Sequence, residues 1–223
     1  MFPYFGRKAR NAGLYPAPRY PNVMEPFAGS LAYSLHFRPQ TVEARDLDER
    51  LVALWQRGVE MGATGVFPMP PEVGTKTDDL LVKLASYSEH ASTSGTMTVT
   101  SRMIRDWPSL TRNMAEAGRW AAGRVFYQQG DYRDLPNLEA TWFIDPPYQF
   151  ANRRGYRHGA SGIDFDALAE WCQSRRGQVI VCEQEGADWL PFKPLYSLSS
   201  HRGSKSTEVI WTNTPTGLAE VES

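Results

Sequence analysis

The sequence predicts an α/β fold in which helices flank a mostly parallel β-sheet. Three observations support this prediction: strand-like apolar runs alternate with helix-periodic segments, a glycine turn follows an early strand, and a later strand ends abruptly at two prolines. The chain has 223 residues, of which 41% are hydrophobic. This size suffices for one substantial domain with an insertion.

The first third of the chain predicts a βαβ unit. Residues 22–30 form a short strand, a turn and the start of a helix, and the apolar residues of 31–37 continue at helical spacing. The arrangement then repeats with a strand from 41 to about Ala44 and a helix that carries Leu51, Leu54 and Trp55.

The second half predicts more strands and one clear helix. Residues 163–177 form a helix with an apolar face, for which Asp164 or Asp166 is the N-cap. Strands are expected within 119–132 after a helix end, at the run that leads to 145–148, at 177–184 and at 207–213.

Residues 58–115 differ from the rest of the chain in composition and in hydrophobic patterning. They begin turn-rich, contain one short helical pattern at 80–88 and then become polar, hydroxyl-rich and basic. We therefore expect an insertion here rather than a layer of the core.

Composition excludes several classes of protein. The formal net charge is −1, so contacts with phosphates require local basic patches. The sequence shows no secretion signal and no apolar run of membrane length, which leads us to expect a cytoplasmic protein that has no contact with membranes. Cys172 and Cys182 have no metal-ligand spacing, so we expect buried free thiols and no metal site.

The most informative stretch is residues 141–150, TWFIDPPYQF. A buried strand ends at Asp145, Pro146, Pro147 and Tyr148. The prolines lack N–H groups and have fixed φ, so they stiffen the turn and prevent further strand pairing. The turn brings a carboxylate, backbone carbonyls and a flat ring together. This set suits a planar base that carries an exocyclic amine.

A second informative site is EPFAGS at residues 25–30. Gly29 lies between a strand and a helix, where backbone can approach a ligand closely, and Asp46 ends the next strand. An acid at that position binds ribose hydroxyls in nucleotide-binding α/β folds. No Walker lysine follows, which disfavours a triphosphate. Both turns are expected at the carboxyl edge of one sheet.

Together these motifs resemble those of the amino-group DNA methyltransferases that use S-adenosylmethionine, most closely the Dam-type adenine-N6 enzymes of bacteria and phages. The DPPY run resembles their catalytic motif, which implies catalytic roles for Asp145, Pro146, Pro147 and Tyr148. The EPFAGS, RDLD, FPYFGRK and GDY runs resemble their cofactor-binding segments. The residues implied in cofactor binding, besides Asp145, are Tyr4, Gly6, Lys8, Glu25, Pro26, Phe27, Gly29, Asp46, Asp131 and Tyr132.

The resemblance also implies the architecture and the partners. It implies a Rossmann-like S-adenosylmethionine methyltransferase fold, with a catalytic domain of residues 1–57 and 116–223 and a target-recognition region at 58–115. Double-stranded DNA is the expected partner and a monomer the expected state, with a dimer as the alternative. The sequence leaves the biological role open among host-restriction evasion, packaging control and a partnership with a restriction enzyme. Basic residues expected at the DNA backbone are Arg153, Arg154, Arg157, Arg202 and Lys205, together with His158.

Some alternatives stay open. The family often has glycines where Leu31 and Arg7 stand in this chain. DPPY also occurs in enzymes that methylate cytosine N4, RNA bases or protein amides, and Asp145 favours adenine. A DNA-binding relative that has lost catalysis is the remaining alternative. Arg102, Arg105 and Arg112 either contact DNA or form a solvated helix face.

Overall fold

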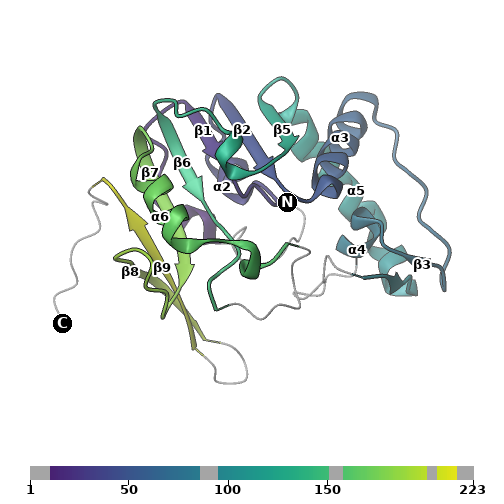
Figure 1. Ribbon diagram of the computed structural model, residues 1–223. Coiled ribbons are helices and arrows are strands. Elements are labelled where there is room, and N and C mark those ends of the chain that lie inside the picture. Colours follow the sequence, from purple (N-terminus) through teal and green to yellow (C-terminus); the bar gives the residue numbers. More distant parts are fainter. Residues whose placement is uncertain (1–10, 86–94, 151–157, 200–204, 215–223) are drawn as a thin grey trace.

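The computed structural model describes residues 11–85, 95–150, 158–199 and 205–214, without the side chains of 198–199 and 205–206. Its centre is a seven-stranded sheet of order β5-β2-β1-β6-β7-β9-β8 (Figure 1). The strands are β1 (Asn22–Glu25), β2 (Thr41–Asp46), β5 (Val125–Gln129), β6 (Ala140–Ile144), β7 (Gly177–Gln184), β8 (Lys193–Ser199) and β9 (Lys205–Thr212). The first five are parallel, and β9 runs antiparallel to both β7 and β8.

Side chains of β6 and β7 alternate between the two faces of the sheet, as the period of two in a strand requires. On one face Trp142 and Val181 pack under Leu168 of α6 (Phe165–Gln173), whose N-cap Asp164 accepts a hydrogen bond from the backbone of Ala167. On the other face Phe143 stacks on Tyr33 of α2 (Ala32–Phe37), with ring centroids 4.2 Å apart. Both central strands are thus buried on both faces, which is typical of parallel sheets.

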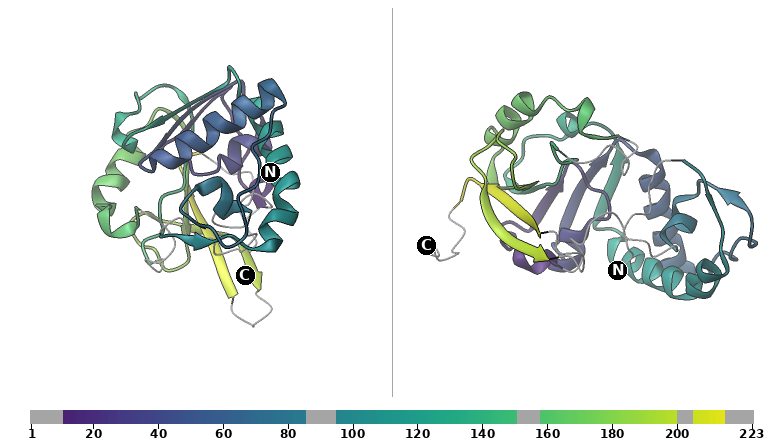
Figure 2. Two further views of the ribbon diagram at one scale, coloured as in Figure 1. Left: turned by 90° about the vertical axis from the view of Figure 1, so that its right-hand side faces the viewer. Right: turned by 90° about the horizontal axis from the view of Figure 1, so that it is seen from below.

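A third hydrophobic cluster lies beside β2 and β5. It is built around α3 (Glu49–Thr64) and α5 (Ser101–Ala121), with α4 (Leu80–Leu84) and a small hairpin of β3 (Lys76–Thr77) and β4 (Met97–Thr98). Short 3₁₀ turns η1 (Ala12–Leu14), η2 (Tyr132–Asp134) and η3 (Ala160–Gly162) complete the described elements. Figure 2 shows this helical group and the β8–β9 pair at opposite ends of the sheet.

Glycines allow α3 and α5 to pack with their backbones in contact. A Cβ placed on Gly118 of α5 would lie 1.9 Å from the carbonyl oxygen of Gly58 in α3, and a Cβ on Gly62 would lie 2.6 Å from the carbonyl oxygen of Ala115. No side chain fits at these distances, so the crossing of the two helices depends on glycine.

Gly118→Ala should therefore destabilise the protein. The helices must separate, and the overpacking cost exceeds the roughly 1 kcal/mol by which alanine favours a helix. We expect the free energy of unfolding in urea to fall by about 2 kcal/mol. Gly159→Ala is the control, since a Cβ at Gly159 meets nothing within 4 Å. An unchanged unfolding midpoint for Gly118→Ala would show that the helices do not pack this closely.

The structure confirms the predicted α/β class with its mostly parallel sheet. Both limits of the region 58–115 fall inside helices, one in α3 and the other in α5, and its apolar residues share a hydrophobic cluster with Val42 of β2. Its assignment to target recognition stays a prediction. The full length of α5 and strand β8 were not predicted, nor were the small β3–β4 hairpin and the 3₁₀ turns. Cys172 and Cys182 are buried free thiols, as expected.

Within the described ranges, no helix has both the length and the apolar character that crossing a membrane requires.

Candidate functional site

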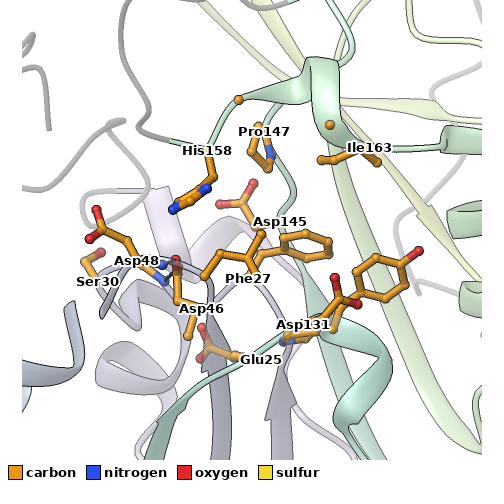
Figure 3. A pocket seen from close by; sticks show the side chains of 18 of the residues that line it. Glu25, Phe27, Ser30, Asp46, Asp48, Asp131, Asp145, Pro147, His158 and Ile163 are labelled. Atoms are coloured by element: carbon orange, nitrogen blue, oxygen red, sulfur yellow. Dashed lines mark hydrogen bonds between the residues drawn. The ribbon is translucent and has the colours of Figure 1, made fainter. Parts of the chain in front are cut away.

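The candidate site lies where the order of the strands reverses. The chain moves outward from β1 to β2 and β5, and then returns to β6 on the other side of β1. Open α/β sheets bind ligands outside the carboxyl ends of the strands at such a point. A cavity of about 360 Å³ is found there, within the usual size range of small-molecule sites (Figure 3).

Four turns and one later segment enclose this cavity. The turns follow β1, β2, β5 and β6, and the segment is 158–163 with η3. The sequence-predicted residues that line the cavity are Glu25, Pro26, Phe27, Gly29, Asp46, Asp131, Tyr132, Asp145 and Pro147. Motifs that are far apart in the sequence therefore meet in one space.

The turn after β1 is held by contacts from its neighbours. Gly29 has a φ of +46° and donates its N–H to Asp46 Oδ2 at 3.0 Å. Its carbonyl accepts from the hydroxyl of Tyr127 at 3.1 Å. Leu31, two residues after Gly29, also has a positive φ of 54°. A left-handed backbone is costly for leucine, and the complete burial of Leu31 offsets this cost.

Asp46 links the turns after β1 and β2. Its second oxygen, Oδ1, accepts from the backbone N–H of Asp48 at 3.0 Å. Burial raises the pKa of Asp46, and the hydrogen bonds from the backbone of Asp48 and Gly29 offset part of that rise. Each oxygen keeps acceptor capacity for a ligand hydroxyl, because a carboxylate oxygen has two lone pairs.

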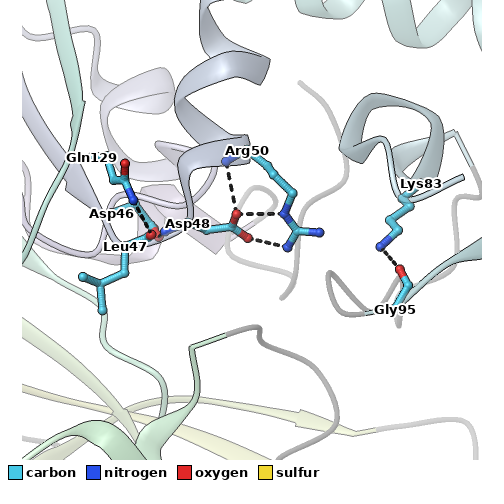
Figure 4. A network of polar contacts seen from close by, with 7 residues as sticks. All are labelled: Asp46, Leu47, Asp48, Arg50, Lys83, Gly95 and Gln129. Atoms are coloured by element: carbon cyan, nitrogen blue, oxygen red, sulfur yellow. Dashed lines mark hydrogen bonds and ion pairs between the residues drawn. The ribbon is translucent and has the colours of Figure 1, made fainter.

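Asp48, the last residue of the RDLD run, also borders the cavity. It caps α3 by accepting from the backbone N–H of Arg50 at 3.1 Å. Its carboxylate also pairs with the guanidinium of Arg50, at 2.8 Å to Nε and 2.6 Å to Nη2 (Figure 4). These contacts fix Asp48 as part of the cavity wall.

An aromatic pair forms another wall. The rings of Phe27 and Tyr132 stack with centroids 5.4 Å apart and an angle of 28° between their planes. Tyr132 also meets Trp171 edge-on at 5.0 Å. Beside this pair, the guanidinium of Arg133 donates to Asp131 at 2.6 Å and lowers the pKa of that carboxyl. A planar ligand ring would find an apolar surface here.

The turn after β6 is fixed by a second carboxylate. Glu183 at the end of β7 is fully buried and accepts from the backbone N–H groups of Gln149 and Gln184, each at 2.7 Å, and from Trp189 Nε1 at 3.3 Å. Burial raises the pKa of Glu183, and the neighbouring charge of Asp145 raises it further. The sequence did not single out Glu183, because the turn that it fixes through Gln149 is 34 positions away in the chain.

The four residues of the DPPY run take different positions. Asp145 and Pro147 line the cavity, while Pro146 and Tyr148 are not among its described lining residues, and Pro146 is buried. The hydroxyl of Tyr148 donates to Glu208 Oε1 at 2.6 Å.

His158, whose contact with a DNA backbone stays a prediction, lines the cavity on the side of Asp46 and Asp145 (Figure 3). Its sequence context, a basic glycine-bearing loop, gave no signal of this position.

Other predicted residues lie outside the described part of the chain. These are Tyr4, Gly6, Lys8, Arg153, Arg154, Arg157 and Arg202, while Lys205 begins β9 with its side chain not described. Their proposed roles stay predictions.

The sequence was also compared with known proteins: no protein family model matches it, and no curated protein matches it.

Proposed function

We propose that the protein is an S-adenosylmethionine-dependent methyltransferase that acts on the N6 amine of adenine in DNA. The observation that carries this proposal is the meeting of the EPFAGS, RDLD, GDY and DPPY turns around one cavity at the switch point of the sheet. The resemblance implies that the first three turns bind the cofactor and that the DPPY turn binds the acceptor amine. Methyl transfer requires the two molecules side by side, so all four turns must border one space.

The charge of the cavity helps to choose among nucleotide-like ligands. Its described lining includes five carboxylates, from Glu25, Asp46, Asp48, Asp131 and Asp145, and no lysine or arginine, although Asp48 and Asp131 are paired with arginines outside the lining. Dinucleotides and nucleoside triphosphates carry phosphates, which such a lining repels. A nucleoside with a cationic sulfonium and an ammonium group suits it.

The residues of the cavity fit the parts of S-adenosylmethionine. The stacked Phe27 and Tyr132 offer a surface for the adenine ring, and Asp46 offers acceptors for the ribose hydroxyls. The positive φ of Gly29 lets its backbone approach the ligand closely. When bound, S-adenosylmethionine supplies a methyl group on a positively charged sulfur.

The DPPY turn then activates the acceptor amine. The lone pair of this amine is delocalised into the base, so the nitrogen is a weak nucleophile. Asp145 and the carbonyl of Pro146 accept hydrogen bonds from its two hydrogens, which directs the lone pair toward the methyl carbon. Asp145 would stabilise the positive charge that grows on this nitrogen as it takes up the methyl group, while the electron pair of the C–S bond would stay on sulfur as a neutral thioether. One N–H proton then leaves to solvent.

The acceptor must reach this turn from a DNA duplex. Flipping the adenine out of the duplex costs a few kcal/mol of stacking free energy, and stacking on Tyr148 offsets part of this cost. Cationic side chains that could meet phosphates are exposed on α5, where 64% of the side chain of Arg102 and 73% of that of Arg105 are accessible.

Calorimetric titration tests the cofactor part of the proposal. S-adenosylmethionine should bind with a micromolar dissociation constant, whereas ATP and NAD should not bind at the same concentrations. Binding of ATP or NAD in place of S-adenosylmethionine would overturn the assignment, and binding of none of them would favour a non-catalytic relative.

A further inference from the structure

The side chain of Tyr148 is held by a carboxylate that no sequence motif singles out. Its hydroxyl donates to Glu208 Oε1 at 2.6 Å, and the hydroxyl of Tyr15 donates to the same oxygen at 2.8 Å. Glu208 belongs to β9, where it pairs in register with Gln184 of β7 and Tyr196 of β8. The acceptor of both phenols is therefore part of the sheet and not of a loop.

Tyr15 fixes this arrangement from the other side. Its side chain is buried, and its ring meets Phe143 edge-on at 5.2 Å and Tyr196 edge-on at 6.3 Å. Because Tyr15 is packed in the core, the carboxylate oxygen that it contacts has little freedom to move.

The backbone around Tyr148 is restrained as well. Pro146 and Pro147 precede it with fixed φ angles, and the N–H of the following residue, Gln149, is bound to Glu183 at 2.7 Å. The conformational freedom of Tyr148 then lies mainly in its two side-chain torsions. A hydrogen bond at the far end of the ring restrains both torsions.

We propose that Glu208 is a positioning residue that holds the ring of Tyr148 ready to stack on the acceptor base. This inference rests on the proposed function, in which Tyr148 contacts the base. A ring that is oriented before the base arrives loses little conformational entropy on binding. Glu208 thus acts on acceptor binding through Tyr148 and has no direct role in the cofactor cavity.

Steady-state kinetics of methyl transfer to duplex DNA test this role. Tyr148→Phe and Glu208→Ala should each raise the KM for DNA about tenfold, while the dissociation constant of S-adenosylmethionine changes less than about twofold. The double variant should be no worse than Glu208→Ala alone, because both changes remove the bond between Tyr148 and Glu208. Glu208→Gln keeps a carbonyl acceptor and should restore most of the affinity for DNA.

Tyr15→Phe is the matched control, because it removes the other hydrogen bond to the same oxygen. It should lower the melting temperature as much as Tyr148→Phe does, and it should raise the KM for DNA less than Tyr148→Phe does, because the bond between Tyr148 and Glu208 remains. If Tyr15→Phe raises that KM equally, or if the effects of Tyr148→Phe and Glu208→Ala multiply in the double variant, the positioning role is wrong.

A readout without turnover separates this inference from the proposed function. In NMR spectra of protein with labelled tyrosine, Glu208→Ala should change the ring signals of Tyr148 toward an averaged, mobile ring. Unchanged signals would overturn the positioning role whatever the activity. If the signals change but the wild-type protein methylates no nucleic acid or protein acceptor, Glu208 positions Tyr148 and the proposed function is wrong.

Discussion

Asp145→Ala should lower the rate of methyl transfer about a thousandfold while S-adenosylmethionine still binds. In the proposed mechanism Asp145 accepts a hydrogen bond from the reacting amine and stabilises the positive charge that develops on nitrogen. Both effects are strongest in the transition state, so kcat should fall much more than the affinity for cofactor. Single-turnover transfer of a tritiated methyl group measures the rate, and calorimetry measures the affinity.

Asp166→Ala is the matched control for this experiment. Asp166 is an exposed acid of α6 that does not line the cavity, so its loss should leave both quantities unchanged. Near-normal turnover of Asp145→Ala would contradict the mechanism. A loss of cofactor binding equal to the loss of rate would instead assign Asp145 to the cofactor site.

Asp46→Ala should weaken the binding of S-adenosylmethionine about a hundredfold. The change removes the acceptors proposed for the ribose hydroxyls, and such charge-assisted hydrogen bonds contribute roughly 1.5–3 kcal/mol each. It also removes the carboxylate that accepts hydrogen bonds from the backbone N–H groups of Gly29 and Asp48. The turns after β1 and β2 are then no longer held together by this side chain. Calorimetry measures the affinity, and the melting temperature reports whether the fold survives.

Glu60→Ala, which removes an exposed acid of α3, controls for the loss of one negative charge. Unchanged cofactor affinity in Asp46→Ala would show that the ribose does not lie beside this acid.

The pH dependence of cofactor binding gives an independent check on Asp46. Because burial raises its pKa, this carboxyl takes up a proton at a higher pH than an exposed aspartate. The protonated form is a weaker acceptor, so affinity should fall as the pH is lowered through the range above the ordinary aspartate pKa, roughly 4. Asp46→Asn should lose this part of the pH dependence.

Local signals in the sequence were enough to predict that the turns after β1 and β2 meet at one edge of the sheet. Gly29 and Asp46 each follow a strand, and parallel strands bring such positions to one edge of a sheet. The structure accordingly sets Gly29 N 3.0 Å from Asp46 Oδ2. The stiff turn at the DPPY run could also be predicted, because two prolines after an apolar strand leave the backbone few conformations.

Two elements were missed for local reasons. In α5, Pro108 interrupts the helical pattern, although Met103, Trp107, Leu110 and Met114 have helical spacing and would have revealed the helix. In β8, Pro194 disfavours a strand, and only the position of β8 at the edge of the sheet tolerates it.

The contacts that hold the DPPY turn and Tyr148 could not be predicted. Glu208 is 60 positions from Tyr148 and 193 from Tyr15, and Glu183 is 34 from Gln149. Such pairs depend on the register of β7 and β9, which one sequence does not specify. His158 lies outside the helices and strands, so no periodic pattern indicates that it lines the cavity.

Nucleoside mass analysis of methylated DNA tests the proposed reaction most directly. The purified protein is incubated with duplex DNA and S-adenosylmethionine that carries a labelled methyl group, with Asp145→Ala as the blank. We expect labelled N6-methyladenine from the wild-type protein and none from the variant. Labelled methylcytosine would contradict the adenine assignment, and unlabelled DNA across varied sequences would contradict DNA methylation itself.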